Sequence, residues 1–132
     1  MSRILVVDDV APVRLVVRVA CEQAGHEVHE AIDAATGIEA YGRVQPHLLV
    51  LDLGMPGGGG PFVLKSLRRD GERRICPVLV VTGNLDQTPD AIRDELAVDR
   101  VLRKPFRISE LMVHVVQLLA LGGRAAAPPP RA

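Results

Sequence analysis

Five short segments with the character of β-strands recur along this chain, and segments with helical spacing lie between and after them. The expected strands are Ile4–Val7, His26–Ile32, Leu48–Leu51, Val78–Val81 and Asp99–Leu102. Apolar residues recur every three or four positions in the intervening stretches, which predicts helices at residues 11–24, 34–44, 61–67, 88–97 and 108–121. Strands that alternate with helices in this way predict an α/β fold, with a five-stranded parallel sheet covered by helices on both faces.

The length of the chain sets the expected number of domains. A chain of 132 residues falls within the usual size of one domain with a single core. Residues 122–132 are rich in glycine, alanine and proline and include a triple proline, which favours polyproline II and offers nothing to pack. We therefore expect one domain over residues 1–121 and a disordered tail over residues 122–132.

The overall charge argues against two classes of partner. Sixteen basic and sixteen acidic side chains cancel, so nothing favours sequence-independent binding to nucleic acid or to an anionic membrane. No apolar run approaches the ~18 residues that a bilayer crossing needs. The two cysteines, Cys21 and Cys76, lie in apolar stretches, lack metal-ligand spacing and are expected as buried thiols of a reducing compartment. Together these observations predict a cytoplasmic protein without direct nucleic-acid or membrane contact.

Polar side chains stand where the predicted strands stop. In chain order these residues are Asp8, Asp9, Asp52, Thr82 and Lys104. The carboxyl ends of parallel strands lie on one edge of a sheet, and open α/β sheets bind their ligands at that edge. We therefore expect these side chains to converge on one site.

Three carboxylates in one pocket repel one another unless protons or a cation lie between them. A divalent cation solves this problem, and carboxylate, carbonyl and water oxygens suit a hard ion such as Mg2+ or Mn2+. Zinc is disfavoured because the four histidines show no shared ligand spacing. Because Mg2+ commonly keeps coordination positions for water and phosphate oxygens, the predicted site suits phosphoryl chemistry.

Lys104 stands out by an internal comparison. The chain contains fourteen arginines and only two lysines, the other being Lys65. An ammonium is a compact charge on a flexible stem, which can pair with a carboxylate and then with a phosphoryl oxygen, whereas a guanidinium is a larger planar fork. We therefore expect Lys104 to act in the site, with the Thr82 hydroxyl as a small donor beside it.

These residues and their spacing resemble the receiver domain of response regulators. The resemblance rests on the acidic pair Asp8-Asp9, on Arg14, on the segment Asp52 to Pro56 followed by Gly60, on Thr82, and on Lys104-Pro105-Phe106. It covers about residues 1–121 and implies a flavodoxin-like, doubly wound fold with five βα units.

The resemblance implies a role for each acidic residue. Asp52 would be the nucleophile that takes a phosphoryl group and becomes an aspartyl phosphate. Asp9, Asp52 and the backbone carbonyl of Gly54 would hold Mg2+, and Asp8 would act on the ion directly or through water.

The resemblance also implies how the phosphoryl group is held. Thr82 and Lys104 would each bind one phosphoryl oxygen, and the peptide bond from Lys104 to Pro105 would be cis. The glycine run Gly57–Gly60 departs from the family, and so do two positions near the phosphoryl group and the switch. Gly83 stands where alanine is favoured and leaves room beside the phosphoryl group. Val101 stands where an aromatic ring usually moves with the threonine, so we expect a switch that relies on backbone movement or on another helix contact.

Signalling would follow from a change of surface. The donor would be a sensor histidine kinase, a histidine phosphotransfer protein or a small phosphodonor. About residues 88–121 would then change their affinity for a downstream target protein. The chain would be a monomer or a weak dimer that depends on phosphorylation. It would not be an enzyme, beyond catalysing its own phosphoryl transfer and autodephosphorylation.

Three alternatives compete with this interpretation. A receiver-like scaffold that binds partners without phosphate would not need the complete set of polar residues at the strand ends. A phosphatase of the haloacid-dehalogenase type would need a second acid two residues after Asp52, where this chain has Gly54. A nucleotide-binding enzyme would need a phosphate-binding glycine motif, and the run Gly57–Gly60 lacks the Lys-Ser or Lys-Thr that should come after it.

Overall fold

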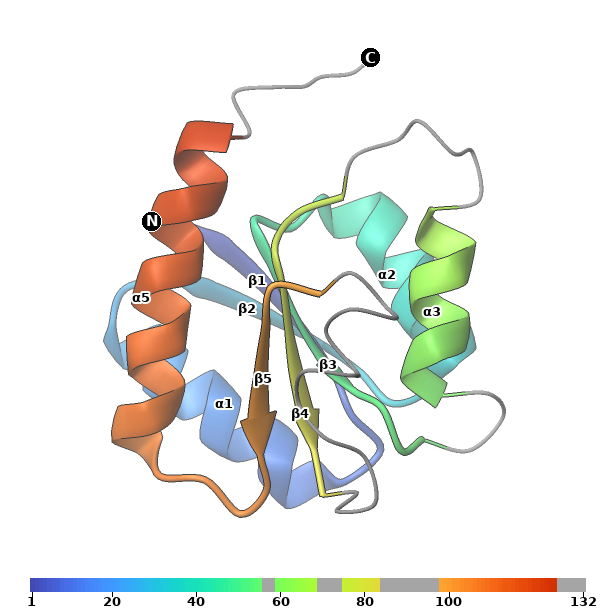
Figure 1. The fold of residues 1–132 in the computed structure, drawn as a ribbon, viewed down its shortest axis with the longest axis horizontal. Helices are drawn as coiled ribbons and strands as arrows, with labels where there is room; N and C mark the ends of the chain where they lie inside the picture. The colour runs from blue at the N-terminus through green and yellow to red at the C-terminus, as the bar shows by residue number, and fades with distance from the viewer. Residues whose placement is uncertain (56–58, 69–74, 84–97, 126–132) are drawn as a thin grey trace.

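Five parallel strands form one sheet in the computed structural model, which describes residues 1–55, 59–68, 75–83 and 98–125 (Figure 1). The strands are β1 (Arg3–Val7), β2 (Glu27–Ala31), β3 (Leu48–Asp52), β4 (Val78–Thr82) and β5 (Arg100–Arg103). Their order across the sheet is β2-β1-β3-β4-β5. This is the strand order of the flavodoxin-like doubly wound fold, so the predicted fold class is confirmed.

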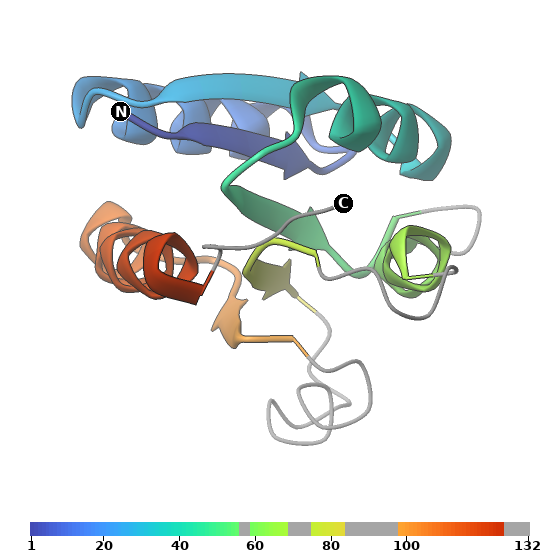
Figure 2. The ribbon, with the colours of Figure 1, turned by 90° about the horizontal axis from the view of Figure 1, so that it is seen from above.

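Helices cover both faces of this sheet. Those in the described ranges are α1 (Ala11–Gln23), α2 (Ala34–Val44), α3 (Gly59–Leu67) and α5 (Ile108–Ala125). The first and last of them lie on one face and the other two on the opposite face, as Figure 2 shows. The helix expected at residues 88–97 lies outside the described residues. None of the helices in the described ranges combines the length and the apolar character that a bilayer crossing requires.

The central strands are buried on both faces, and their alternating side chains build two core layers. Ile4 and Val6 of β1 belong to the layer under α1 and α5, whereas Leu5 and Val7 belong to the layer under α2 and α3. All four side chains are at most 1% exposed. Strands β3 and β4 alternate in the same way. Continuously apolar strand sequences result from this double burial, because neither face of the strand meets water.

The start of α3 differs from the expectation. The helix begins at Gly59 inside the glycine run rather than at Pro61. Gly59 adopts a left-handed backbone with φ of 58°, and a Cβ on Gly60 would lie 2.8 Å from the carbonyl oxygen of Asp52. Only glycine allows this close approach of the helix to the turn after β3. Glycine's low helix propensity made the run look like a loop, and tertiary packing overrides that preference.

The end of α5 also differs from the expectation. The helix continues to Ala125 rather than ending near Leu121, so residues 122–125 of the expected tail are helical. The two glycines at 122 and 123 indicated a helix end. They are followed by Arg124 and Ala125, which are good helix formers, and the helix passes through them. Residues 126–132 lie outside the described residues.

Tyr41 ties α2 to the segment that leads into β4. Its hydroxyl oxygen accepts a hydrogen bond from the backbone N–H of Cys76 at 2.9 Å.

Cys76 is partly buried and Cys21 is fully buried in the layer under α1 and α5. Both are free thiols, and the prediction of a buried thiol is met by Cys21 and only in part by Cys76. Burial raises the pKa of the Cys21 thiol to about 11, so this thiol is protonated and acts as a small core residue.

Two histidines anchor the amino-terminal edge of the sheet. Nδ1 of His26 accepts a hydrogen bond from the backbone N–H of Ser2 at 3.2 Å, and Nδ1 of His47 accepts one from Arg3 at 2.9 Å. Burial lowers the pKa of both imidazoles, and the charge of Arg3 lowers the pKa of His47 further. Neither histidine belongs to a metal-binding group among the described residues.

We expect acid to weaken this edge, because a protonated imidazole cannot accept a hydrogen bond. The pKa of each imidazole is lower in the folded than in the unfolded protein. The stabilisation by these hydrogen bonds is therefore complete above about pH 6.5, the unfolded pKa, and is lost as the pH falls from there toward the folded pKa. The double variant His26→Asn/His47→Asn places an amide oxygen near each Nδ1 and should flatten the decline. Urea unfolding at about pH 7.5, 6.5 and 5.5 measures this. His29→Asn, on β2, is the control, and an equal decline in the double variant would contradict the prediction.

Candidate functional site

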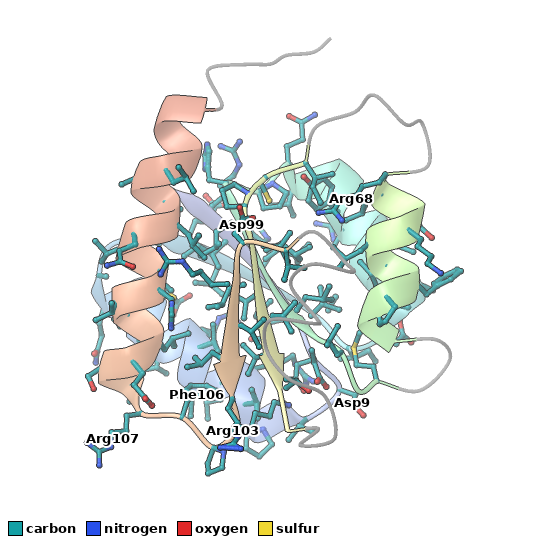
Figure 3. All side chains as sticks on the ribbon, in the orientation of Figure 1. Asp9, Arg68, Asp99, Arg103, Phe106 and Arg107 are labelled. Carbon is teal, nitrogen blue, oxygen red and sulfur yellow. The ribbon has the colours of Figure 1, made fainter. Side chains whose placement is uncertain are left out.

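The carboxyl ends of β1 and β3 bring three aspartates together. These strands are paired neighbours, with Val7 opposite Leu51, so Asp8 and Asp52 continue them side by side. One carboxylate oxygen from each of Asp8, Asp9 and Asp52 lies within 4.8 Å of the others. Figure 3 shows Asp9 at the end of the sheet toward which the strands point. The structure thus brings the three predicted carboxylates into one cluster.

Asp8 is buried and held from several directions. Its side chain is 3% exposed. Its backbone N–H donates to the carbonyl of Ala31 on β2 at 3.2 Å, and its Oδ1 accepts from the N–H of Val10 at 2.9 Å. Its Oδ2 lies 2.9 Å from Nζ of Lys104. A carboxylate buried this deeply needs such a cation, because removing its charge from water is costly.

Asp52 is buried between opposing influences. Its Oδ1 accepts a hydrogen bond from the N–H of Gly54 at 3.0 Å, and its Oδ2 lies 3.6 Å from Nζ of Lys104. Burial raises the pKa of Asp52 above its ordinary value, and the charges of Asp8 and Asp9 raise it further, against the Gly54 N–H and Lys104. The protein environment therefore destabilises the ionised form of Asp52, and a cation in the cluster would reduce this destabilisation.

Lys104 reaches the cluster from the end of β5. Its backbone N–H donates to the carbonyl of Thr82 at 2.8 Å, which joins the ends of β4 and β5. The peptide bond to Pro105 is cis, as the resemblance implies. The side chain is 19% exposed, and its single ammonium faces the two buried carboxylates, Asp8 and Asp52.

Thr82 and Gly83 stand at the same edge of the sheet. Thr82 ends β4, which pairs with β3 so that Val81 lies opposite Asp52. Its side chain is buried. Gly83 is exposed, and a Cβ there would lie 3.8 Å from Cβ of Lys104, an ordinary contact distance. Both residues are therefore at the predicted end of the sheet, and their contacts with a phosphoryl group stay predictions.

Arg14 was named in the family resemblance, but the charged network that it forms beside the cluster was not predicted. Nη1 of Arg14 donates to the backbone carbonyl of Asp8 at 2.8 Å, and its Nε donates to Glu30 on β2 at 2.9 Å. Arg18 also binds Glu30, at 2.7 Å. One signal was present in the sequence, because Arg14 and Arg18 are four residues apart and so share one face of α1. Nothing local identified Glu30 as their partner.

Val101 occupies β5 at the position where an aromatic ring was expected. It is partly buried and packs against the core layer under α2 and α3. As a β-branched residue it has few rotamers available. Of the surface expected to signal, residues 98–121 are described and residues 88–97 lie outside the described ranges.

The donor atoms of the cluster fit a hard divalent cation. Among the described residues, Asp8, Asp9 and Asp52 are the one group of acidic, histidine or cysteine side chains close enough to hold a metal ion together. Their donors are carboxylate oxygens, without thiolate or imidazole. This chemistry suits Mg2+ or Mn2+ and disfavours zinc.

Removing the ammonium should destabilise the fold, and Mg2+ should correct much of the loss. We expect Lys104→Met, which keeps an aliphatic side chain, to lower the free energy of unfolding by about 2–3 kcal/mol in metal-free buffer, because Asp8 and Asp52 lose their shared cation. Millimolar Mg2+ should restore more than half of it by supplying positive charge to the same carboxylates. Urea unfolding with and without Mg2+ measures both effects.

The other lysine supplies the control for that measurement. Lys65 is exposed on α3. Lys65→Met should change the stability by less than about 0.5 kcal/mol with or without Mg2+. A loss in Lys104→Met that Mg2+ leaves unchanged would show that the lysine acts through packing rather than through charge.

Comparison with known proteins identifies relatives across most of the chain. A family model described as the response regulator receiver domain matches residues 4–116. The DNA-binding dual master transcriptional regulator RpaA of Synechocystis sp. is 37% identical over 120 residues, which are 90% of this chain and 49% of that protein. The phosphate regulon transcriptional regulatory protein PhoB of Escherichia coli is 35% identical over 114 residues, which are 86% of this chain and 49% of that protein. The chain thus spans about half the length of these curated relatives.

A solved structure shows the same architecture. The receiver domain of the Francisella response regulator 1452 superposes with a TM-score of 0.80 at 27% identity, covering 92% of this chain and 98% of that chain. Sequence and fold therefore agree on one family.

Proposed function

This chain belongs to the response regulator receiver family, and we propose that it is the phosphoacceptor of a two-component system, phosphorylated on Asp52 in a reaction that requires Mg2+. One observation carries the proposal. The buried carboxylate of Asp52 lies within reach of two further carboxylates and of the Lys104 ammonium. A candidate nucleophile, a group of ligands for a cation and a positive charge therefore meet at one edge of the sheet.

The proposed step is a direct phosphoryl transfer. One oxygen of Asp52 forms a bond to phosphorus while the bond between phosphorus and the donor breaks. The donor leaves as the histidine of a partner protein, or as acetate when acetyl phosphate is used. Because the N–H of Gly54 already binds Oδ1 at 3.0 Å, the orientation of the carboxylate is set before the donor arrives.

Asp8, Asp9 and Asp52 would hold the cation, together with the proposed backbone carbonyl of Gly54. When bound, Mg2+ neutralises charge on the phosphoryl oxygens. Burial raises the pKa of Asp52, and the charges of Asp8 and Asp9 raise it further. This crowding of carboxylates supports the assignment, because it favours the entry of a cation. Asp9, the exposed member of the cluster, is open to solvent on the side from which an ion would enter.

Lys104 and Thr82 would bind the transferred phosphoryl group. The ammonium of Lys104 lies between Asp8 and Asp52 and would exchange one of these contacts for a phosphoryl oxygen. Thr82 is buried at the end of the neighbouring strand, and its hydroxyl would be the second donor to the phosphoryl group. Donors already aimed at developing charge are the main source of catalysis in phosphoryl transfer.

The position of Gly54 speaks against an aspartate-nucleophile phosphatase. Such an enzyme would use a second acid two residues after its nucleophile. Here that residue is a glycine, and it supplies a backbone N–H to Asp52. The proposal therefore limits the chemistry of the chain to its own phosphoryl transfer and autodephosphorylation.

The proposed partners derive from this role. The donor would be a sensor histidine kinase or a histidine phosphotransfer protein. The output would be a contact between a target protein and the surface of about residues 88–121, in a monomer or a weak phosphorylation-dependent dimer. A net charge of zero supports a protein target over direct binding to nucleic acid.

Intact mass spectrometry tests the proposal directly. After incubation with Mg2+ and acetyl phosphate or phosphoramidate, we expect the chain to gain the mass of one phosphoryl group. Asp52→Asn should show no gain, because the amide is no nucleophile, and chelation of Mg2+ should abolish the gain in the native chain.

A phosphoryl gain in Asp52→Asn, or a gain without divalent cation, would contradict the proposed site. Absence of any gain in the folded chain would support the phosphate-independent scaffold, provided that beryllofluoride, which forms a stable mimic of the acyl phosphate, also fails to bind. Beryllofluoride binding without a mass gain would instead indicate rapid hydrolysis.

Val101 should limit the size of the conformational response. We expect backbone NMR shifts of β5 and α5 to change less on beryllofluoride binding than they do in Val101→Tyr, because valine has no ring to move between buried and exposed positions. Val113→Tyr, on the exposed face of α5, is the control for adding a ring. Native shift changes as large as those of Val101→Tyr would show that the switch does not use this position.

A further inference from the structure

We propose that Arg14 is a positioning residue for the cation site, because it fixes the peptide group between Asp8 and Asp9. This inference rests on the proposed Mg2+-dependent function. It adds a residue that would touch neither the cation nor the phosphoryl group, and whose effect on both would pass through the backbone of the acidic pair.

Arg14 binds two partners at once from the first turn of α1. Its Nη1 donates to the carbonyl oxygen of Asp8 at 2.8 Å, and its Nε donates to Oε1 of Glu30 at 2.9 Å. The side chain is only 14% exposed, so water competes little for either contact. A guanidinium presents its donors in a fixed planar fork, and so the carboxylate of Glu30 sets the direction from which Arg14 meets the carbonyl.

The bound carbonyl matters because the next residue in the chain is Asp9. The carbonyl of Asp8 and the N–H of Asp9 belong to one planar peptide group. Holding the carbonyl therefore fixes the orientation of this peptide plane and, with it, the backbone N–H of Asp9. Asp8 has further anchors in Ala31, Val10 and Lys104. The Asp9 side chain is exposed and makes no hydrogen bond or ion pair with the described residues. Its place in the cluster therefore depends on its backbone.

The network of Arg14, Arg18, Glu30 and Glu22 orients the backbone of the site but adds no net charge to it. Glu30 lies between Arg14 and Arg18, and Arg18 also lies 3.3 Å from Glu22. Two guanidiniums thus face two carboxylates, and their charges balance. Compensation of the acidic cluster comes from Lys104, so a loss of Arg14 should act through the placement of Asp9 and not through the net charge of the pocket.

Arg18 provides a matched control on the same helix. It binds the same glutamate, through Oε2 at 2.7 Å, and donates to the carbonyl of Val28 at 3.0 Å. It makes no contact with the acidic pair among the described residues. Both variants to alanine lose an ion pair to Glu30, but only Arg14→Ala frees the Asp8 carbonyl.

Isothermal titration calorimetry with Mg2+ alone tests the inference. Removing partners that orient metal ligands typically weakens metal binding by about 10–100-fold. We expect Arg14→Ala to raise the Mg2+ dissociation constant about tenfold and Arg18→Ala to change it by less than about twofold. Arg14→Lys should fall between the native chain and Arg14→Ala, because one ammonium cannot reproduce the fork. Urea unfolding of each variant shows whether they lose comparable stability.

Labelling with acetyl phosphate gives a second readout. A positioning role predicts that Arg14→Ala needs about tenfold more Mg2+ for half-maximal labelling and approaches the native rate at saturating Mg2+. Unchanged Mg2+ affinity in Arg14→Ala, or equal weakening in Arg14→Ala and Arg18→Ala, would overturn the inference. If Arg14→Ala does not fold, Arg14→Lys against Arg18→Lys decides the question in the same way. A native chain that binds Mg2+ but gains no phosphoryl group or beryllofluoride would refute the proposed function and leave this inference standing.

Discussion

The contact between the Lys104 ammonium and the buried carboxylates of Asp8 and Asp52 governs the carboxyl edge of the sheet. Lys104 and Asp8 come directly after β5 and β1, and Asp52 is the last residue of β3, so one cation joins three strand ends that are distant in the chain. The carboxylates alone would repel each other in a buried setting. Within the described chain, the ammonium that lies against both carboxylates comes from the residue after β5, which pairs with β4. The site therefore contains side chains from both halves of the sheet.

Much of this arrangement is encoded locally. Strands buried on both faces must be continuously apolar, so the polar residue at which each run stops marks both the strand end and the sheet edge. That rule predicts one shared edge for Asp8, Asp52, Thr82 and Lys104, and the fold has all four there. The roles of these residues came from the resemblance to a family and are not visible in the spacing itself.

The features that sequence reasoning missed share one physical cause, which is packing between distant segments. Glycine disfavours helices on its own, but α3 begins at Gly59, and the backbone at Asp52 lies too close to Gly60 for any side chain there. The end of α5 ran past two glycines for which a local rule predicts a stop. Glu30 sits on an edge strand with no local mark of function, and only the fold brings it to Arg14. Local patterns define elements well and long-range partners poorly.

The hydrogen bond between Tyr41 and the backbone of Cys76 determines which part of the molecule intrinsic fluorescence can report on. The chain has one tyrosine and no tryptophan, so its intrinsic fluorescence comes from a single ring. That ring is joined to the segment before β4, at the amino-terminal edge of the sheet, whereas the acidic cluster occupies the carboxyl edge. The fluorescence of the native protein therefore reports the packing of α2 against the segment before β4. It does not directly report changes at Asp52. To follow the site by fluorescence, a fluorophore must be introduced at the carboxyl edge of the sheet.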